Sequence, residues 1–290
     1  MASYYSYHRS TPPPAPPTHR PHRLRILGTV VIIGMVGVMY YHSQKHKTGT
    51  VAAAPATSHA ALSQNISADA ISDIIHGDSD DDIGVAVENI ATGKLNTYGD
   101  TTPFTAASTT KVLSAVAYYH LVEQGQLSLS TVLGAYPVSY QLELMVNDSD
   151  NDSWQLIDDA IGTAARVAYA QSIGLNYDAD DNTLSAADMA KLLGQLYAGK
   201  LLNPQHTAQL LSYMQHTNNE TMIPAAVPAS LTVYHKYGEL DTGELHDAAI
   251  ISNGKTAYAV VIYTTGNSSV STRTAIIKQL ASAVISTYHI

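Results

Sequence analysis

Residues 66–290 begin and end with segments in which apolar and polar residues alternate, as they do in β-strands. This pattern constrains the fold more than any other sequence feature. Alternating apolar and polar residues run through 82–98 as a predicted hairpin, and they return at 231–237, 245–252 and 256–265. Helical patterns fill the part between. Because strands from both ends of a domain can pair in one sheet, this order is typical of an α+β fold. We predict an antiparallel sheet built from both ends of the domain, with a helical insert.

Apolar residues three or four positions apart predict the helices. The longest pattern extends from Ser108 to Gln124 and stops at Gly125, a residue type that commonly ends helices. The expected helices lie near residues 71–75, 108–124, 139–147, 153–161, 163–173, 185–198, 204–215 and 271–288.

The first 65 residues differ in composition from the rest of the chain. Prolines, histidines and arginines dominate 1–25, which we interpret as a disordered cytoplasmic tail. Residues 26–41 form an uncharged apolar run, and 42–65 are polar and rich in Ala, Ser and Thr, as in a linker. The predicted globular domain is 66–290, a normal length for one core.

The apolar run predicts one transmembrane helix. Its 16 residues would span about 24 Å as a helix, slightly less than the roughly 30 Å of a hydrocarbon core. Four basic residues precede the run and two follow it, which predicts a cytoplasmic N-terminus and an exported domain. A cleaved signal peptide is the alternative, because residues 52–54 are all Ala, although about ten polar residues separate them from the run.

Composition limits the chemistry. The chain has no Cys, so a covalent nucleophile must be Ser, Thr, Lys or a carboxylate. Six of the 15 basic residues and none of the 24 acidic ones lie in the first 48 positions, so the remainder carries a net charge of −15. This charge argues against a nucleic-acid partner. The 13 His residues form no recognisable metal-binding motif, and we expect neither a metal nor a cofactor.

Ser108-Thr109-Thr110-Lys111 is the first candidate for catalysis. Ser and Lys three positions apart share one helical face, so the ammonium group could lie within hydrogen-bond reach of the hydroxyl. A desolvated Lys could then make the serine nucleophilic. By itself this short pattern is more often structural, with Ser at a helix start and Lys one turn later.

Two further motifs follow it along the chain. Ser149-Asp150-Asn151 lies between two helical stretches, where Asp150 would ordinarily be a helix cap. His235-Lys236-Tyr237-Gly238 lies near the end of a predicted strand. A strand-borne cation beside a glycine allows close approach of a ligand, although edge lysines also prevent aggregation.

Together, the order S-x-x-K, S-D-N and K-x-G resembles the motif set of serine penicillin-recognising enzymes. VENIATGKLNTYGDTTPFTAASTTKVLSA, LSAADMAKLLGQLYAGKLL and HKYGELDTGELHDAAII extend the resemblance over roughly residues 70–290. The chain is identified as a member of the class A β-lactamase-like serine hydrolases. The resemblance implies a β-lactamase/transpeptidase-like fold, here preceded by the transmembrane helix.

The resemblance also implies catalytic roles. Ser108 would attack the carbonyl of a β-lactam or an acyl-D-Ala-D-Ala-type peptide, and Lys111 would assist removal of its proton. Ser149 would relay a proton toward the leaving nitrogen. Lys236 would support Ser149 and attract the substrate carboxylate.

Four residues would bind substrate by the same resemblance. Asn151 would hydrogen-bond the substrate's amide side chain, and Gly238 would allow close approach. The backbone N–H groups of Ser108 and Glu239 would form the oxyanion hole. Tyr237 stands where the family usually has Thr or Ser for the substrate carboxylate, and Glu239 adds negative charge there.

A second departure concerns deacylation. Class A enzymes carry a glutamate on an omega loop that activates the deacylating water, yet no Glu occurs here between Glu143 and Glu220. The segment is also shorter than in the family. Only three aspartates could replace the glutamate, and we interpret them as a solvated acidic turn: Asp178, Asp180 and Asp181.

The sequence therefore predicts a membrane-anchored, monomeric serine hydrolase with its catalytic domain outside the cell. It would form an acyl-enzyme at Ser108 with β-lactams or cell-wall peptides and deacylate slowly. A catalytically weak or inactive cell-wall peptide-binding ectodomain is the main alternative. A structural ectodomain with relic motifs is a third possibility, but a relic has no chemical reason to keep Ser108, Lys111, Ser149, Asn151 and Lys236.

Overall fold

The computed structural model describes residues 68–290. The predicted tail (1–25), transmembrane helix (26–41) and linker (42–65) lie outside these residues. Within the described part, no helix combines the length and the apolar character needed to cross a membrane.

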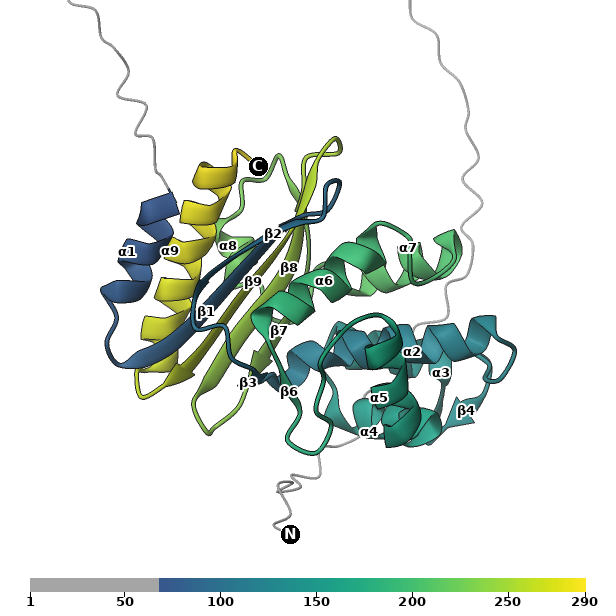
Figure 1. Cartoon of the computed structure of the whole chain (residues 1–290). Helices are drawn as coiled ribbons and strands as arrows, with labels where there is room; N and C mark the ends of the chain where they lie inside the picture. Colours follow the sequence, from purple (N-terminus) through teal and green to yellow (C-terminus); the bar gives the residue numbers. More distant parts are fainter. Residues whose placement is uncertain (1–67) are drawn as a thin grey trace, which may run out of the picture. The chain divides into compact units, whose positions relative to one another are not determined.

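A five-stranded antiparallel sheet forms the centre of the domain (Figure 1). Strands from both ends of the described domain contribute to it, which confirms the predicted α+β arrangement. The last strand along the chain, β9, lies between β1 and β8 and pairs with both. In spatial order the strands are β2 (Lys94–Gly99), β1 (Asp81–Asn89), β9 (Ala257–Gly266), β8 (Glu244–Ser252) and β7 (Thr232–Glu239).

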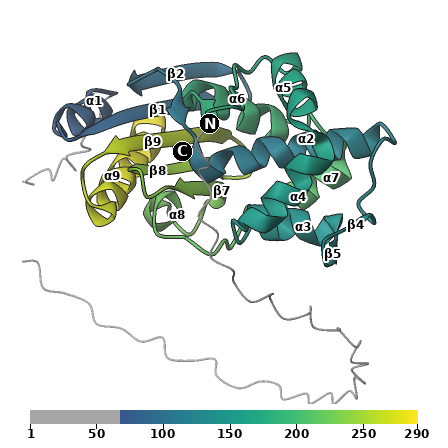
Figure 2. The same ribbon diagram turned by 90° about the horizontal axis from the view of Figure 1, so that it is seen from below.

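Helices from the two ends of the domain cover one face of the sheet. α1 (Ala68–His76) and α9 (Val270–Tyr288) lie side by side there, as Figures 1 and 2 show, with the short α8 (Ile223–Ala226) beside α9. Their apolar sides pack on the sheet in a cluster that includes Val260, Ile262 and Leu280, all fully buried. Removal of this aliphatic surface from water stabilises the layer.

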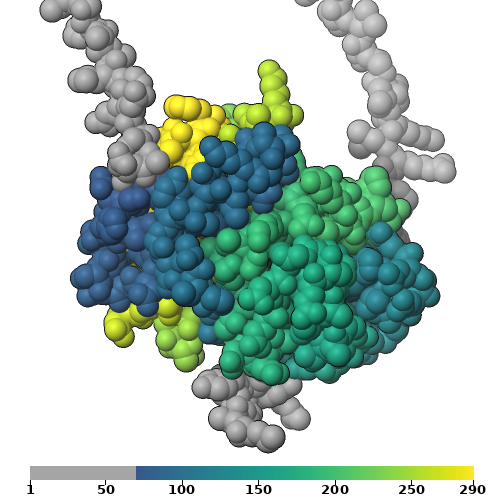
Figure 3. Space-filling view, viewed as in Figure 1, coloured from purple at the N-terminus to yellow at the C-terminus, as the bar shows by residue number. Residues whose placement is uncertain are grey.

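The helical insert covers the other face. It begins with a 3₁₀ turn, η1 (Ala107–Thr110), which leads directly into α2. The space-filling view shows the insert, in teal and green, adjoining the β1–β2 region in blue (Figure 3). Its helices are α2 (Lys111–Glu123), α3 (Val138–Val146), α4 (Asn151–Ile161), α5 (Thr163–Ser172), α6 (Ala186–Tyr197) and α7 (Pro204–Tyr213).

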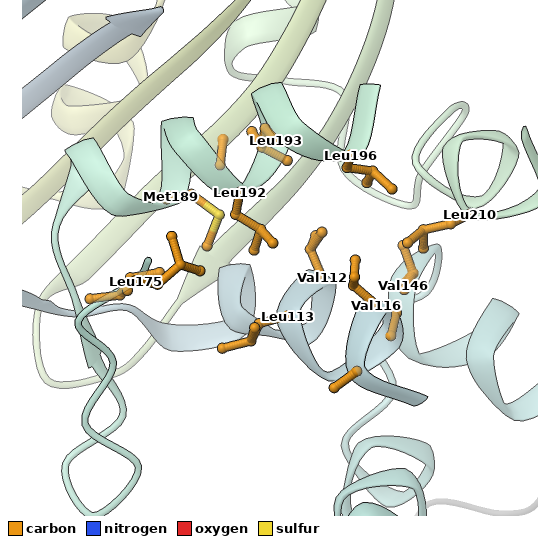
Figure 4. Close-up of a cluster of buried hydrophobic side chains, with 14 of the residues drawn as sticks. Val112, Leu113, Val116, Val146, Leu175, Met189, Leu192, Leu193, Leu196 and Leu210 are labelled. Carbon is orange, nitrogen blue, oxygen red and sulfur yellow. The ribbon is translucent and has the colours of Figure 1, made fainter. Parts of the chain in front are cut away.

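α2 is the central helix of this insert. Every side chain from Lys111 to Tyr119 is buried, so the helix is enclosed on all sides. Val112 and Val116 of α2 face the leucines of α6, as Figure 4 shows, which fixes α2 against the sheet through α6. A rigidly held α2 also fixes the residues that precede it.

Four short strands were not predicted. β3 (Phe104–Thr105) pairs with β6 (Thr183–Leu184), and β4 (Val132–Leu133) pairs with β5 (Tyr136–Pro137). Two-residue strands show no periodicity, so the sequence pattern does not reveal them. The β3–β6 pair matters for the site, because it brings the segment before β6 next to η1.

Candidate active site

Ser108 is the partly exposed residue of η1, whereas its neighbours Ala107, Thr109 and Thr110 are buried. Ala107 has φ of 51°, a left-handed conformation that is uncommon for a residue with a Cβ. Such conformations concentrate at functional sites, where the surrounding structure maintains them. The candidate nucleophile thus lies at a strained turn at the start of a buried helix.

Lys111 is fully buried, and its Nζ has three acceptors. It donates to Ser149 O at 2.6 Å, to Ser149 Oγ at 3.2 Å and to Asn151 Oδ1 at 2.7 Å. The sequence suggested that Nζ could lie within hydrogen-bond reach of Ser108 Oγ. Within residues 68–290, the hydrogen bonds of Nζ go to the S-D-N segment instead. Burial lowers the pKa of Lys111 to about 7, although the charge of Asp150 opposes this shift.

The S-D-N segment is the turn between α3 and α4. Asp150 caps α4, because its carboxylate accepts from Ser153 N at 2.7 Å, as the sequence predicted for an ordinary cap. Ser149 has φ of 59°, a second left-handed residue at the site. This conformation places both its carbonyl and its hydroxyl within reach of Lys111 Nζ.

β7 approaches η1 at Gly238. A Cβ on Gly238 would lie 3.0 Å from Ser108 N and 3.2 Å from Thr109 N, which is tighter than ordinary contact, so a side chain there would require the start of η1 to shift by a few tenths of an ångström. Lys236, two residues earlier, is fully buried, and its Nζ donates to Tyr237 O at 3.0 Å. Burial and the charge of Lys111 lower the pKa of Lys236 well below its usual value.

Tyr237 connects β7 to the S-D-N turn. Its hydroxyl donates to Asn218 Oδ1 at 2.8 Å. Asn218 in turn donates from Nδ2 to Asp148 O at 2.7 Å. Glu239 is exposed at the end of β7. No motif or spacing pointed to Asn218, a lone amide in a loop.

A buried ionic cluster supports β7 from the side. His235 Nδ1 lies 2.9 Å from Asp247 Oδ1, and His235 Nε2 lies 2.9 Å from Thr217 Oγ1 and 3.2 Å from Glu220 Oε1. Asp247 Oδ2 also accepts from Ile223 N at 2.9 Å. Burial opposes a charge on His235, but the two carboxylates outweigh it and raise the pKa to about 9. A charged His235 therefore ties segment 217–223 to the sheet.

The segment before β6 presents an amide to η1. Asn182 Nδ2 donates to Ala107 O at 3.0 Å, and Asn182 Oδ1 accepts from Thr110 Oγ1 at 2.8 Å. Its own φ is 51°, so three of the five non-glycine residues with left-handed φ in the described part lie at this site. The expected aspartates of the same turn, Asp178, Asp180 and Asp181, are exposed, as a solvated acidic turn requires.

No set of three or more His, Asp or Glu side chains within 68–290 is grouped as metal ligands would be. His246 is fully buried, and burial lowers its pKa to about 4. Its neutral ring donates from Nε2 to Thr105 O and accepts from Thr264 N. Trp154 packs on α2, with Lys111 Nζ 5.0 Å from its ring centroid. Both residues have structural partners.

Comparison with known proteins gives a consistent picture. A family described as the β-lactamase enzyme family matches residues 66–288. The structure is similar to that of the last common ancestor of Gram-negative bacteria class A β-lactamase, with a TM-score of 0.71 and 25% identity over 76% of this chain and 98% of that one. PBP-A gives a TM-score of 0.69 at 23% identity, over 79% and 97%. A β-lactamase from Xanthomonas campestris gives 0.70 at 22%, over 75% and 95%.

Proposed function

This chain belongs to the β-lactamase enzyme family, and we propose that it forms an acyl-enzyme at Ser108 with β-lactams or D-Ala-D-Ala-type cell-wall peptides. The observation that carries the proposal is the buried Lys111, whose Nζ joins the helix of Ser108 to Ser149 and Asn151. A serine beside a desolvated lysine of lowered pKa is an activated nucleophile.

In the proposed acylation, a neutral Lys111 accepts the proton of Ser108 Oγ as this oxygen attacks the substrate carbonyl. A pKa of about 7 leaves much of Lys111 neutral at physiological pH. The backbone N–H groups of Ser108 and Glu239 would stabilise the oxyanion. Ser149 Oγ then gives its proton to the leaving nitrogen and receives from Lys111 Nζ, 3.2 Å away, the proton that Lys111 removed from Ser108. The carbon–nitrogen bond breaks and the serine ester remains.

We propose that hydrolysis of this ester is slow. A general base contributes about 10²–10⁴-fold to such a step. In the segment before β6, the side chain that contacts η1 is the amide of Asn182. An amide does not act as a base near neutral pH. The nearby carboxylates of Asp180 and Asp181 are exposed to solvent. A stoichiometric burst followed by slow turnover is the expected kinetic pattern.

Labelling with a fluorescent penicillin, followed by mass analysis of the modified peptide, tests the proposal. We expect one label per chain on Ser108 and none on Ser108→Ala, which should keep its fold because the change removes one small side-chain group. Stopped-flow hydrolysis of a chromogenic cephalosporin then tests deacylation. Equal labelling of Ser108→Ala contradicts the acyl-enzyme, and fast turnover without a burst contradicts slow deacylation.

A cell-wall peptide-binding protein without efficient catalysis is the second candidate. Tyr237 in place of a short hydroxyl side chain favours it, as does the lack of a Glu between Glu143 and Glu220. This alternative predicts that the domain binds peptidoglycan peptides with equal affinity in the wild type and in Ser108→Ala, while neither protein is labelled by penicillin.

We also propose the membrane anchor predicted from residues 26–41, with the catalytic domain exported as a monomer. Protease added to intact cells should digest the domain and leave the N-terminal tail protected. A shortened, soluble secreted form would instead show that the apolar run belongs to a cleaved signal peptide.

A further inference from the structure

An aromatic side chain encloses one of the two lysines of the candidate site. Lys236 Nζ lies 4.1 Å from the ring centroid of Tyr237 and donates to Tyr237 O at 3.0 Å. The Lys236 side chain has no exposed surface, and neither has Lys111. Lys111 Nζ already bonds to Ser149 and Asn151. Both amino groups are therefore surrounded by partners from the same chain.

The Tyr237 hydroxyl is occupied as well. It donates to Asn218 Oδ1 at 2.8 Å. Asn218 is held in place by its bond to Asp148 O. Through Asn218, the phenol thus connects β7 to Asp148, directly before the S-D-N motif, and it occupies space that a shorter side chain would leave open.

Two carboxylates also act on this phenol. Burial has the largest effect on the pKa of Tyr237 and raises it, hydrogen bonding of the hydroxyl lowers it, and the charges of Glu239 and Asp148 raise it. Both carboxylates are exposed beside the site. The face of an aromatic ring also carries partial negative charge. A carboxylate brought to Tyr237 would lose hydration, meet like charges and gain no free ammonium group.

We propose that Tyr237 is a specificity-determining residue that selects acyl donors with an ester or amide, rather than a free carboxylate, beside the leaving group. The inference rests on the proposed acyl-enzyme at Ser108. Within the proposed substrates, it makes β-lactams and peptides with a free carboxylate beside the leaving nitrogen the slower acyl donors, and their esterified or amidated counterparts the faster ones. The Tyr237 ring covers Lys236 and so keeps its amino group from a substrate carboxylate. The negative charge of Glu239 adds to this preference against a free carboxylate.

The test compares a chromogenic cephalosporin that has a free carboxylate with the methyl ester of the same compound. We expect the ester to acylate Ser108 at least about tenfold faster, after correction for the reactivity of each compound with hydroxide. The rate with the acid should rise with added salt, because salt screens repulsion between exposed charges. A faster reaction with the acid in the wild-type protein overturns the inference.

Variants of Tyr237 and Glu239 test which residues cause the preference for the ester. Tyr237→Thr should lower the ester-to-acid ratio to about one or below, since a small hydroxyl uncovers Lys236 and can donate to a carboxylate. Glu239→Gln, at an exposed position, should lower the ratio by a smaller factor and serves if Tyr237→Thr does not fold. Asp73→Asn on α1, which removes an equal charge on the opposite face of the sheet, should leave the ratio unchanged. An unchanged ratio in both Tyr237→Thr and Glu239→Gln overturns the inference.

A neutral fluorophosphonate separates this inference from the function on which it rests. It carries no carboxylate and should label Ser108 in the wild type but not in Ser108→Ala. Labelling together with a preference for the acid overturns only the specificity. Absence of labelling overturns the acyl-enzyme, and the specificity with it.

Discussion

The α9 face of the sheet and the β7 edge beside η1 differ in what they bury. Aliphatic side chains such as Ile262 and Leu280 fill the centre of the α9 face. The β7 edge instead buries charged and polar groups, with exposed fractions of 0–1%: Lys111, His235, Lys236 and Asp247. Buried ionisable groups weaken or barely help a fold, whereas buried aliphatic groups stabilise it. The comparison indicates that stability and chemistry lie in different parts of the same sheet.

The largest expected effect is on activity at the β7 edge. Lys111→Met should slow acylation of Ser108 by about 10²–10⁴-fold, because the base is lost while the hydrophobic stem is kept. The melting temperature should change little, since removing a buried amine offsets the loss of its hydrogen bonds. Penicillin labelling rates and thermal unfolding measure the two effects. Lys191→Met, at an exposed lysine of α6, is the control, and unchanged labelling in Lys111→Met would refute the role of Lys111.

The converse prediction concerns the α9 face. Leu280→Ala should lower the free energy of unfolding by about 2–5 kcal/mol, because it leaves a cavity in a fully buried aliphatic cluster. The labelling rate of the folded protein should stay the same. Urea unfolding gives the first quantity, and Gln279→Ala, an exposed neighbour on α9, is the control. A large loss of labelling rate in folded Leu280→Ala would show that the two regions are coupled.

The His235 cluster should make stability depend on pH. Because its folded pKa of about 9 exceeds the ordinary 6.5, the charge contributes fully below pH 6.5 and is lost as pH rises through 9. The contribution is at most about 3 kcal/mol. On the acid side, the hydrogen bond from His235 lowers the pKa of Glu220 to about 2. The charge of Glu220 therefore makes a smaller contribution to stability, which is lost as the pH falls from 4.5 to 2.

Urea unfolding of the wild type and of His235→Gln at pH 6, 8 and 10 checks this dependence. The difference in the free energy of unfolding should shrink steadily toward pH 10. A constant difference would mean that His235 acts through packing alone. His206→Gln, which removes the largely buried pair between this α7 residue and Glu123 of α2, is the matched control.

The smallest effect is expected at the acidic turn. Asp180→Asn and Asp181→Asn change exposed carboxylates, so stability should change by less than about 0.5 kcal/mol and slow turnover should be unaffected. Stopped-flow measurement of steady-state cephalosporin hydrolysis checks this. Loss of turnover in either variant would identify an aspartate as the deacylation base and would overturn its interpretation as a solvated residue.

Most of the fold could be predicted because long elements carry strong periodicity. The final helix was expected at 271–288 and occupies 270–288, and the strand that bears Lys236 was expected at 231–237 and occupies 232–239. α8 and the two-residue strands are too short for any period. The 3₁₀ start of the α2 region was missed because the sequence pattern there is the same as that of a helix.

The site was only partly predictable for a related reason. The order of the motifs pointed to Ser108, Lys111 and Ser149. The amides of Asn182 and Asn218 reach the site through the tertiary packing of loops, which the spacing of residues in the sequence does not reveal. His235 and Asp247 did leave a signal, since they are polar residues within strands that are otherwise buried. Their side chains had to be satisfied inside the fold, and each satisfies the other.

The position of β9 has a consequence for how this domain can be made. β9 pairs with β1 from Asp81↔Gly266 to Asn89↔Tyr258, so these contacts close a very long stretch of chain. Contacts of such high sequence separation form slowly, because loop-closure entropy must be overcome first. Until Gly266 has left the ribosome, the β1–β2 hairpin and the β7–β8 hairpin keep unpaired edges, which favour aggregation. The domain therefore completes its sheet only after almost the whole chain has been synthesised, and truncations before β9 should yield aggregates rather than a smaller folded core.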